Sequence, residues 1–254
     1  MPHVQREGVS VYYEDLGEGP AILLSHGYSA TSKMWAGQAE AFKDSYRVIS
    51  WDMRGHGDTD SPEDPDAYSE EHTVEDMAAI LDACGIDRAV VGGLSLGGYM
   101  SLAFHLKYPE RVSALMLFDT GPGYRNPDAR ATWNEQAEKT ARGLEADGLE
   151  ALTKKGNDEM RKDWHRSAQG LANAARGMLA QVDSRVLETL PAIPVPTLVL
   201  VGENDKAFIA PTDYMAKKIP NSTRVVIEDA GHASNLHQPA AFNAAMDAFL
   251  QDIA

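Results

Sequence analysis

The sequence predicts an α/β fold in which helices cover both faces of a mainly parallel sheet. Short apolar runs typical of buried strands alternate along most of the chain with longer stretches whose apolar residues recur at helical spacing. One such run, Ala89–Leu94, continues into Gly93-x-Ser95-x-Gly97, and an amphipathic stretch from Tyr99 to Tyr108 follows at once. A sharp strand-to-helix turn requires small residues on both sides of its central residue, because a side chain there would collide with the turn.

The region before this turn supplies a hairpin, two strands and a helix. The hairpin arms flank Glu7-Gly8 and are expected at an edge of the sheet. The expected arms and strands are Val4–Arg6, Val9–Tyr13, Ala21–Ser25 and Arg47–Trp51. Apolar residues at helical spacing then predict a helix that ends at Gly85, and they are Val74, Met77, Ile80, Leu81 and Cys84.

The region after the turn contains three more strands and a C-terminal helix. The strands are expected at Val112–Phe118, Pro196–Val201 and Thr223–Ile227. The helix begins after Pro239, and its apolar face is formed by Phe242, Ala245, Met246, Phe249 and Leu250.

One long segment, residues 121–190, has no convincing strand and is rich in charged, helix-forming sequence. Its expected helices are Asp128–Arg142, Gly148–Arg161, Ala168–Leu179 and Ser184–Leu190. We therefore expect residues 1–120 and 191–254 to form one core and residues 121–190 to form a helical cap that roofs Ser95 and excludes water. Trp133 and Trp164 are candidates to line the cap above a substrate, and packing inside the cap is the alternative for each. Four arginines of this segment are candidates to bind a substrate carboxylate, and the alternative for each is exposure to solvent on a helix. They are Arg125, Arg130, Arg161 and Arg166.

Composition is that of a single globular unit. The 254 residues carry a formal charge of −15, which argues against nucleic acid or an anionic membrane as a partner. Cys84 is the only cysteine, so no intrachain disulfide can form. Neither a signal-peptide core nor a membrane-spanning run is present in the sequence, and we expect a cytoplasmic protein. No cluster of residues has metal-ligand spacing, and we expect neither a metal nor a cofactor.

Three side chains in the order Ser, Asp, His follow the ends of predicted strands. A serine hydroxyl becomes a nucleophile when a base removes its proton and an acid orients that base. Ser95 follows the first of these strands, Asp205 the second and His232 the third. Ligand sites of open parallel sheets lie at the carboxyl ends of the strands, so we expect the three to meet there. Asp119 is a competing candidate for the acid, and Glu203 is a weaker one.

Five short segments carry a resemblance to a known family. They are His26-Gly27, Asp52-x-Arg54-Gly55-His56-Gly57, Gly93-Leu94-Ser95-Leu96-Gly97-Gly98, Gly202-x-x-Asp205 and Gly231-His232. In these segments the chain resembles α/β-hydrolase fold serine hydrolases, in the group that includes carboxylesterases and 3-oxoadipate enol-lactonases. The resemblance implies an eight-stranded sheet with the cap inserted after the sixth strand. It also implies an oxyanion hole formed by the backbone N–H groups of Tyr28 and Leu96.

The resemblance implies hydrolysis of a small-molecule carboxylic ester or lactone through an acyl-enzyme. Ser95 would be the nucleophile, His232 the base and Asp205 the orienting acid, in a monomer or a homodimer. A serine at this position disfavours dehalogenase and epoxide hydrolase chemistry, in which the nucleophile is an aspartate. Two alternatives remain: C–C bond hydrolysis or perhydrolysis on the same residues, and a ligand sensor with slow turnover.

Overall fold

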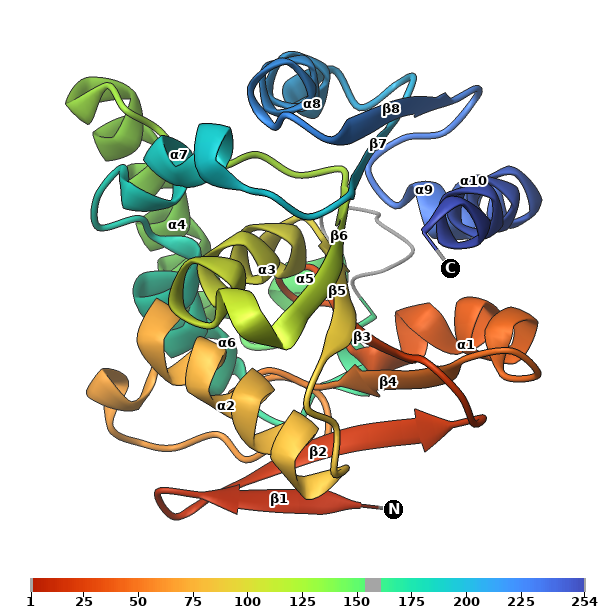
Figure 1. The fold of residues 1–254 in the computed structure, drawn as a ribbon. Coiled ribbons are helices and arrows are strands. Elements are labelled where there is room, and N and C mark those ends of the chain that lie inside the picture. The colour runs from red at the N-terminus through yellow and green to blue at the C-terminus, as the bar shows by residue number, and fades with distance from the viewer. Residues whose placement is uncertain (1, 154–160, 254) are drawn as a thin grey trace.

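The computed structural model describes residues 2–153 and 161–253, and these form an eight-stranded sheet (Figure 1). The strand order is β1-β2-β4-β3-β5-β6-β7-β8. The hairpin β1–β2 pairs antiparallel with the edge of the sheet, and all pairs from β4 to β8 are parallel. The strands are His3–Arg6 (β1), Val9–Leu16 (β2), Ala21–Ser25 (β3), Arg47–Trp51 (β4), Ala89–Leu94 (β5), Val112–Phe118 (β6), Thr197–Gly202 (β7) and Ser222–Ile227 (β8). The predicted fold class is confirmed.

Helices cover the sheet on both faces, and each face has its own apolar cluster. Figure 1 shows α2 and α3 on one side of the sheet and α1 and α10 on the other. The α-helices are Ala36–Phe42 (α1), Glu70–Ala83 (α2), Leu96–Lys107 (α3), Pro127–Asp147 (α4), Glu150–Thr153 (α5), Ala168–Ala174 (α6), Arg185–Thr189 (α7), Lys206–Lys218 (α8), Ser234–His237 (α9) and Pro239–Asp252 (α10). Short 3₁₀ turns lie at Ser32–Trp35 (η1), Pro65–Ala67 (η2), Pro109–Arg111 (η3), Lys162–Trp164 (η4) and Leu190–Ala192 (η6), and one π-turn lies at Ala175–Leu179 (η5).

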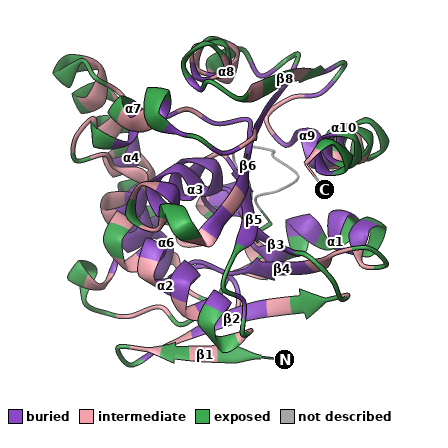
Figure 2. Cartoon of the chain, viewed as in Figure 1, coloured by how far each residue is buried: buried purple, intermediate pink, exposed green. Residues whose placement is uncertain are grey.

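The central strands are buried on both faces, which explains their continuous apolar sequence (Figure 2). Side chains of a strand point alternately to the two faces. Along β6, Leu115 and Leu117 therefore enter the cluster under α2 and α3, whereas Ala114 and Met116 enter the cluster under α1 and α10.

The segment 121–190, which we call the helical insertion, connects β6 to β7. Within its described residues it contains helices and turns and no strand. Asn126 caps α4 by accepting hydrogen bonds from the N–H groups of Asp128 and Ala129, and Pro127 occupies the first helical position. Leu144 and Leu171 of the insertion pack into the same apolar cluster as α2 and α3. The insertion is thus anchored to one face of the core.

The predicted boundaries of several helices differ from the observed ones. The expected helix Asp128–Arg142 runs instead from Pro127 to Asp147, where Gly148 takes a positive φ of 63° and ends it. Of the expected helix Gly148–Arg161, the structure describes α5, and residues 154–160 lie outside the described residues. The expected helix Ala168–Leu179 changes from α to π geometry at Ala175.

Candidate active site

Ser95 lies on a strained turn between β5 and α3. Its φ of 55° and ψ of −114° place a non-glycine residue in a conformation that is rarely adopted. A Cβ atom at Gly93 would lie 2.5 Å from the carbonyl carbon of Gly97, so only glycine fits beside the turn. The N–H of Ser95 donates to the carbonyl of Phe118 at 2.9 Å, and the Thr120 hydroxyl donates to the Ser95 carbonyl at 2.6 Å. The backbone on both sides therefore holds the serine in place.

Asp205 and His232 are brought together from the ends of two neighbouring strands. Asp205 follows β7, and His232 lies in the loop between β8 and α9. The Nδ1 atom of His232 lies 2.7 Å from Oδ2 of Asp205. A carboxylate can only accept, so Nδ1 carries the proton and Nε2 is the nitrogen with the lone pair. The ring of Phe208 stacks on the imidazole with centroids 4.9 Å apart, which fixes its orientation.

The two competing acids have different partners. Asp119 is fully buried and accepts hydrogen bonds from the N–H of Gly202 at 2.8 Å and from the hydroxyl of Ser234. Burial raises the pKa of Asp119 to about 7. Glu203 accepts from the N–H of Asp229 at 3.1 Å. The structure thus pairs the Nδ1 atom of His232 with Asp205, the acid that the sequence favours.

The loop after β3 lies directly against the serine turn. A Cβ atom at Gly27 would lie 3.6 Å from the Cβ atom of Ser95. Tyr28 is the next residue of this loop, and Leu96 is the first residue of α3. N–H groups in the first turn of a helix have no acceptor within the helix, so the N–H of Leu96 is available to an anion at Ser95.

Two buried histidines hold this loop through backbone hydrogen bonds. His26 accepts from the N–H of Met53 at 2.9 Å through Nε2 and donates through Nδ1 to the carbonyl of Gly27 at 2.7 Å. His56 accepts from the N–H of Ser29 at 3.0 Å through Nε2. Both rings therefore organise the backbone of this loop.

The helical insertion supplies two further contacts to the same loop. His165 lies with Nε2 2.9 Å from the carbonyl oxygen of Ser29, and its Nδ1 accepts from the N–H of Gly57 at 3.3 Å. The hydroxyl of Tyr28 donates to the carbonyl of Leu171 at 2.7 Å. His165 is buried because the insertion folds back onto this loop.

The three histidine rings are neighbours and are held neutral. The centroids of His26 and His56 lie 4.9 Å apart, and those of His56 and His165 lie 5.8 Å apart. Burial lowers the pKa of His26 and that of His165 to about 4, and it lowers the pKa of His56 as well. Each ring can therefore accept from a backbone N–H at neutral pH.

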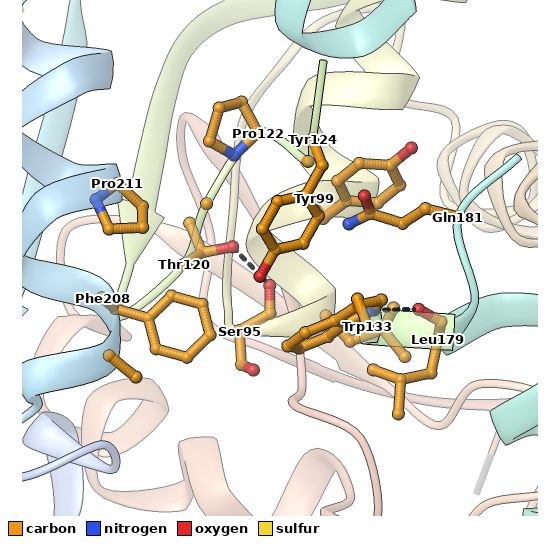
Figure 3. A pocket seen from close by; sticks show the side chains of 14 residues that line it. Ser95, Tyr99, Thr120, Pro122, Tyr124, Trp133, Leu179, Gln181, Phe208 and Pro211 are labelled. Carbon is orange, nitrogen blue, oxygen red and sulfur yellow. Dashed lines mark hydrogen bonds between the residues drawn. The ribbon is translucent and has the colours of Figure 1, made fainter. Parts of the chain in front are cut away.

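A cavity of about 110 Å³ opens beside Ser95 (Figure 3). Its wall is largely apolar, and it includes Leu96, Tyr99, Pro122, Trp133, Leu179 and Phe208. Trp133 lines the cavity as expected, and its indole N–H donates to the carbonyl of Leu179 at 2.7 Å. Trp164 is not among the described residues that line it. It lies on η4, where the Arg161 guanidinium is 5.5 Å from its ring centroid.

The described parts of the chain contain no group of three or more His, Cys, Asp or Glu side chains arranged to hold a metal ion. Among the helices that the structure describes, none combines the length and the apolar character needed to cross a membrane.

Comparison with known proteins places the chain in a family. Residues 20–239 match the family model described as the alpha/beta hydrolase fold. The chain is an alpha/beta hydrolase. The resemblance that the sequence motifs indicate is thereby confirmed.

Some relatives match this alpha/beta hydrolase over nearly its full length. It is 31% identical to a Bacillus subtilis protein named provisionally as a 2-succinyl-6-hydroxy-2,4-cyclohexadiene-1-carboxylate synthase, with 96% of each chain covered. It is also 31% identical to 3-oxoadipate enol-lactonase 1 of Acinetobacter baylyi, with 98% of this chain and 95% of that one covered. A solved thermophilic esterase from Thermogutta terrifontis superposes with a TM-score of 0.84 at 32% identity, covering 99% of this chain and 98% of that one.

Sequence reasoning did not identify several residues around the serine of this alpha/beta hydrolase. Phe208, Tyr99 and Gln181 all line the cavity, and none of them belongs to one of the short motifs. Phe208 follows Asp205 by one helical turn, and that spacing is the only signal in the sequence that could have indicated it.

Proposed function

We propose that this alpha/beta hydrolase cleaves carboxylic esters or lactones through an acyl-enzyme on Ser95. The observation that carries the proposal is the 2.7 Å contact between Nδ1 of His232 and Oδ2 of Asp205. The imidazole of His232 stacks on Phe208, and Phe208 lines the same cavity as Ser95. The enol-lactonase and the esterase among the relatives support this reaction class.

In the proposed reaction, the Oγ atom of Ser95 attacks the ester carbonyl while Nε2 of His232 takes its proton. The Asp205 carboxylate keeps the imidazole in the required tautomer and stabilises the imidazolium. The N–H groups of Tyr28 and Leu96 face the oxyanion as it forms, and one such donor contributes about 3 kcal/mol to lowering the barrier. His232 then protonates the leaving alcohol, and an acyl-serine remains.

Deacylation repeats these steps with water as the nucleophile. His232 takes a proton from water, and the hydroxide attacks the acyl carbonyl. The collapsing intermediate releases the carboxylic acid and returns the proton to Ser95. In this proposal the helical insertion acts as the cap that limits the access of bulk water, with Trp133 against the substrate. No step requires a cofactor.

Replacement of the nucleophile tests the proposal. The Ser95→Ala variant should lose at least about 10⁴-fold in kcat on p-nitrophenyl butyrate, because the attacking oxygen is gone. It should also no longer be labelled by an uncharged fluorophosphonate, and its circular dichroism spectrum should remain that of the parent protein. Ser45→Ala, at an exposed serine, is the matched control and should retain full activity. Activity of Ser95→Ala within a few-fold of the parent protein would contradict the proposal.

A further inference from the structure

The cavity beside Ser95 carries no ionised side chain among its described lining residues. Several polar groups of its wall are already bonded elsewhere. The Thr120 hydroxyl donates to the Ser95 carbonyl and the Trp133 indole to the Leu179 carbonyl (Figure 3). The Tyr99 hydroxyl donates to Glu70 at 2.7 Å. A bound substrate therefore meets a mostly apolar surface.

The arginines that the sequence offered as carboxylate ligands have other partners or lie at the surface. Arg130 donates to the backbone carbonyl of Tyr124 at 3.2 Å. Arg161 forms an ion pair with Asp163 at 3.3 Å, Arg166 forms one with Asp58, and Arg125 is exposed.

Other charged side chains of α2 and of the insertion form ion pairs with each other. Glu70, which accepts from Tyr99, forms an ion pair with Arg185 at 2.5 Å. Arg176 of the insertion lies 2.8 Å from Glu138 and 2.5 Å from Glu145. The chain as a whole carries −15. No ionised side chain lines this cavity among the described residues, so a carboxylate bound there would lose its hydration without gaining a cation from the wall, and that loss disfavours binding strongly.

The wall also carries the hydroxyl of Tyr124 and the amide of Gln181. The backbone of Gln181 is fixed to α4 by two hydrogen bonds with the Asn134 side chain, at 2.8 and 2.9 Å. Its Oε1 atom is buried and has no hydrogen-bond partner in the structure. Figure 3 shows the amide directed into the space beside Tyr99. Gly123 leaves the room for it, since a Cβ atom there would lie 2.9 Å from Oε1.

An unpaired buried amide favours a ligand that pairs with it. An amide offers a donor and an acceptor whichever way it is turned, so a hydroxyl, keto or ether oxygen can bond to it. The volume of about 110 Å³ is smaller than the closed cavity of roughly 150 Å³ that admits benzene in another protein, which favours a short acyl group.

We propose that the substrate is a short, uncharged ester or lactone whose acyl part carries one oxygen that hydrogen-bonds to Gln181. This inference rests on the proposed function and adds the substrate class to it. It sets the chain apart from relatives that are named after carboxylate compounds, 3-oxoadipate and a cyclohexadiene-1-carboxylate.

A matched pair of esters tests the charge discrimination. Mono-p-nitrophenyl succinate carries a carboxylate where p-nitrophenyl 4-methylpentanoate carries an isosteric isopropyl group. After subtraction of the enzyme-free rate, kcat/KM for the neutral ester should exceed that for the anion about 100-fold. Equal values, or a preference for the anion, would overturn the inference and leave the proposed function intact. Hydrolysis of neither ester, together with no fluorophosphonate labelling of Ser95, would contradict both.

Substitution of Gln181 tests its role in specificity. In a series of p-nitrophenyl esters, one ether oxygen is moved along an acyl chain of fixed length, and each ester is compared with its all-carbon counterpart. At the position that meets the amide, the ether-to-carbon ratio of kcat/KM should fall about tenfold in Gln181→Leu. Gln136→Leu, on the exposed side of α4, is the control and should keep the ratios of the parent protein.

A gain of function completes the test. Gln181→Lys places a cation in the wall. It should reduce the ratio of kcat/KM between the 4-methylpentanoate and the succinate esters at least tenfold. Ether-to-carbon ratios that stay unchanged in Gln181→Leu at every position would overturn the assignment of Gln181, whatever the stability of the lysine variant.

Discussion

Asp119 and Asp205 are the same kind of side chain in two environments at neighbouring strand ends. Asp205 meets a donor that becomes charged during the proposed reaction, the imidazole of His232. Asp119 meets two neutral donors in a fully buried position, and this burial raises its pKa to about 7. A carboxylate that is hard to ionise cannot stabilise an imidazolium well. Its hydrogen bonds instead tie the end of β7 to the loop that carries His232.

We predict that Asp205→Asn lowers kcat on p-nitrophenyl butyrate by about four orders of magnitude, because the charge that orients His232 is lost. Asp119→Asn should lower kcat by no more than about tenfold, since asparagine keeps an acceptor for Gly202 or Ser234. Both variants are measured on one ester, with urea unfolding to separate activity from stability. A larger loss of kcat in Asp119→Asn than in Asp205→Asn would show that the acid is assigned wrongly.

At the scale of elements, the junction of β5 with α3 is the tightest contact of the site. A Cβ atom at Gly97 would lie 2.7 Å from the carbonyl oxygen of His26 and closer still to that of Ser25. The first turn of α3 therefore rests directly on the end of β3. This close approach keeps Ser95 beside the loop that carries Tyr28.

Gly97→Ala should reduce the free energy of unfolding by more than about 2 kcal/mol, because the added methyl forces β3 and α3 apart. Esterase activity should fall with it, since Ser95 and Tyr28 separate. Gly143→Ala is the matched control, because Gly143 lies within α4 with open space around its Cβ position. Gly143→Ala should raise the free energy of unfolding by about 1 kcal/mol. Urea unfolding measures both, and equal effects of the two substitutions would refute the argument.

The strands are predicted well from the sequence, because they depend on local signals, and the three residues that we propose as catalytic are selected by the same signals. A parallel strand buried on both faces is a continuous apolar run, and Ser95 and Asp205 follow such runs. His232 follows the edge strand β8, which is only partly buried and whose apolar run is shorter. Helices without a strong local signal are missing from the prediction. α1 has only seven residues and contains Gly37, and α8 contains Pro211.

The cavity wall could not be predicted for a different reason. Thr120, Trp133, Gln181 and Phe208 come from separate segments, and only the placement of the insertion over the strand ends brings them together. No spacing in the sequence relates Gln181 to Ser95. For the same reason the sequence could not distinguish the two tryptophans. Trp133 lines the cavity, whereas Trp164 lies on η4 and is not among the lining residues.

At the scale of the whole molecule, buried titratable groups link stability to pH. The pKa of His26 and that of His165 are lowered to about 4, so the unfolded chain binds protons more readily than the folded one. Their contribution to stability is complete above the unfolded value of about 6.5 and is lost as the pH falls towards 4. Asp119, with its raised pKa, acts in the opposite sense, and its contribution is lost as the pH rises through about 7.

We predict that the free energy of unfolding falls between pH 7.5 and pH 5, with His165 alone responsible for on the order of 2 kcal/mol. His165→Gln keeps a donor and an acceptor but does not titrate. The variant should have a lower free energy of unfolding than the parent protein at pH 7.5. Between pH 7.5 and pH 5 its free energy of unfolding should fall by less than that of the parent protein. His3→Gln, at an exposed histidine, serves as the control, and urea unfolding at the two pH values gives the difference. An equal loss in His165→Gln and the parent protein would show that His165 is not one of the groups responsible.

The bonds from Tyr28 to Leu171 and from His165 to Ser29 bear on whether this enzyme can be rebuilt from parts. Hydrolases of one fold invite the construction of chimaeras, in which the insertion of one enzyme is grafted onto the sheet of another to change the substrate. In this chain the two pieces are not interchangeable modules, because the graft removes groups that hold the loop of Tyr28, a residue that we propose as an oxyanion donor. A chimaera designed only to match helix lengths would acquire a new binding pocket but lose the hydrogen bonds that position the Tyr28 loop, and we expect it to lose activity. A successful graft has to carry a histidine at position 165 and a backbone carbonyl in the place of that of Leu171.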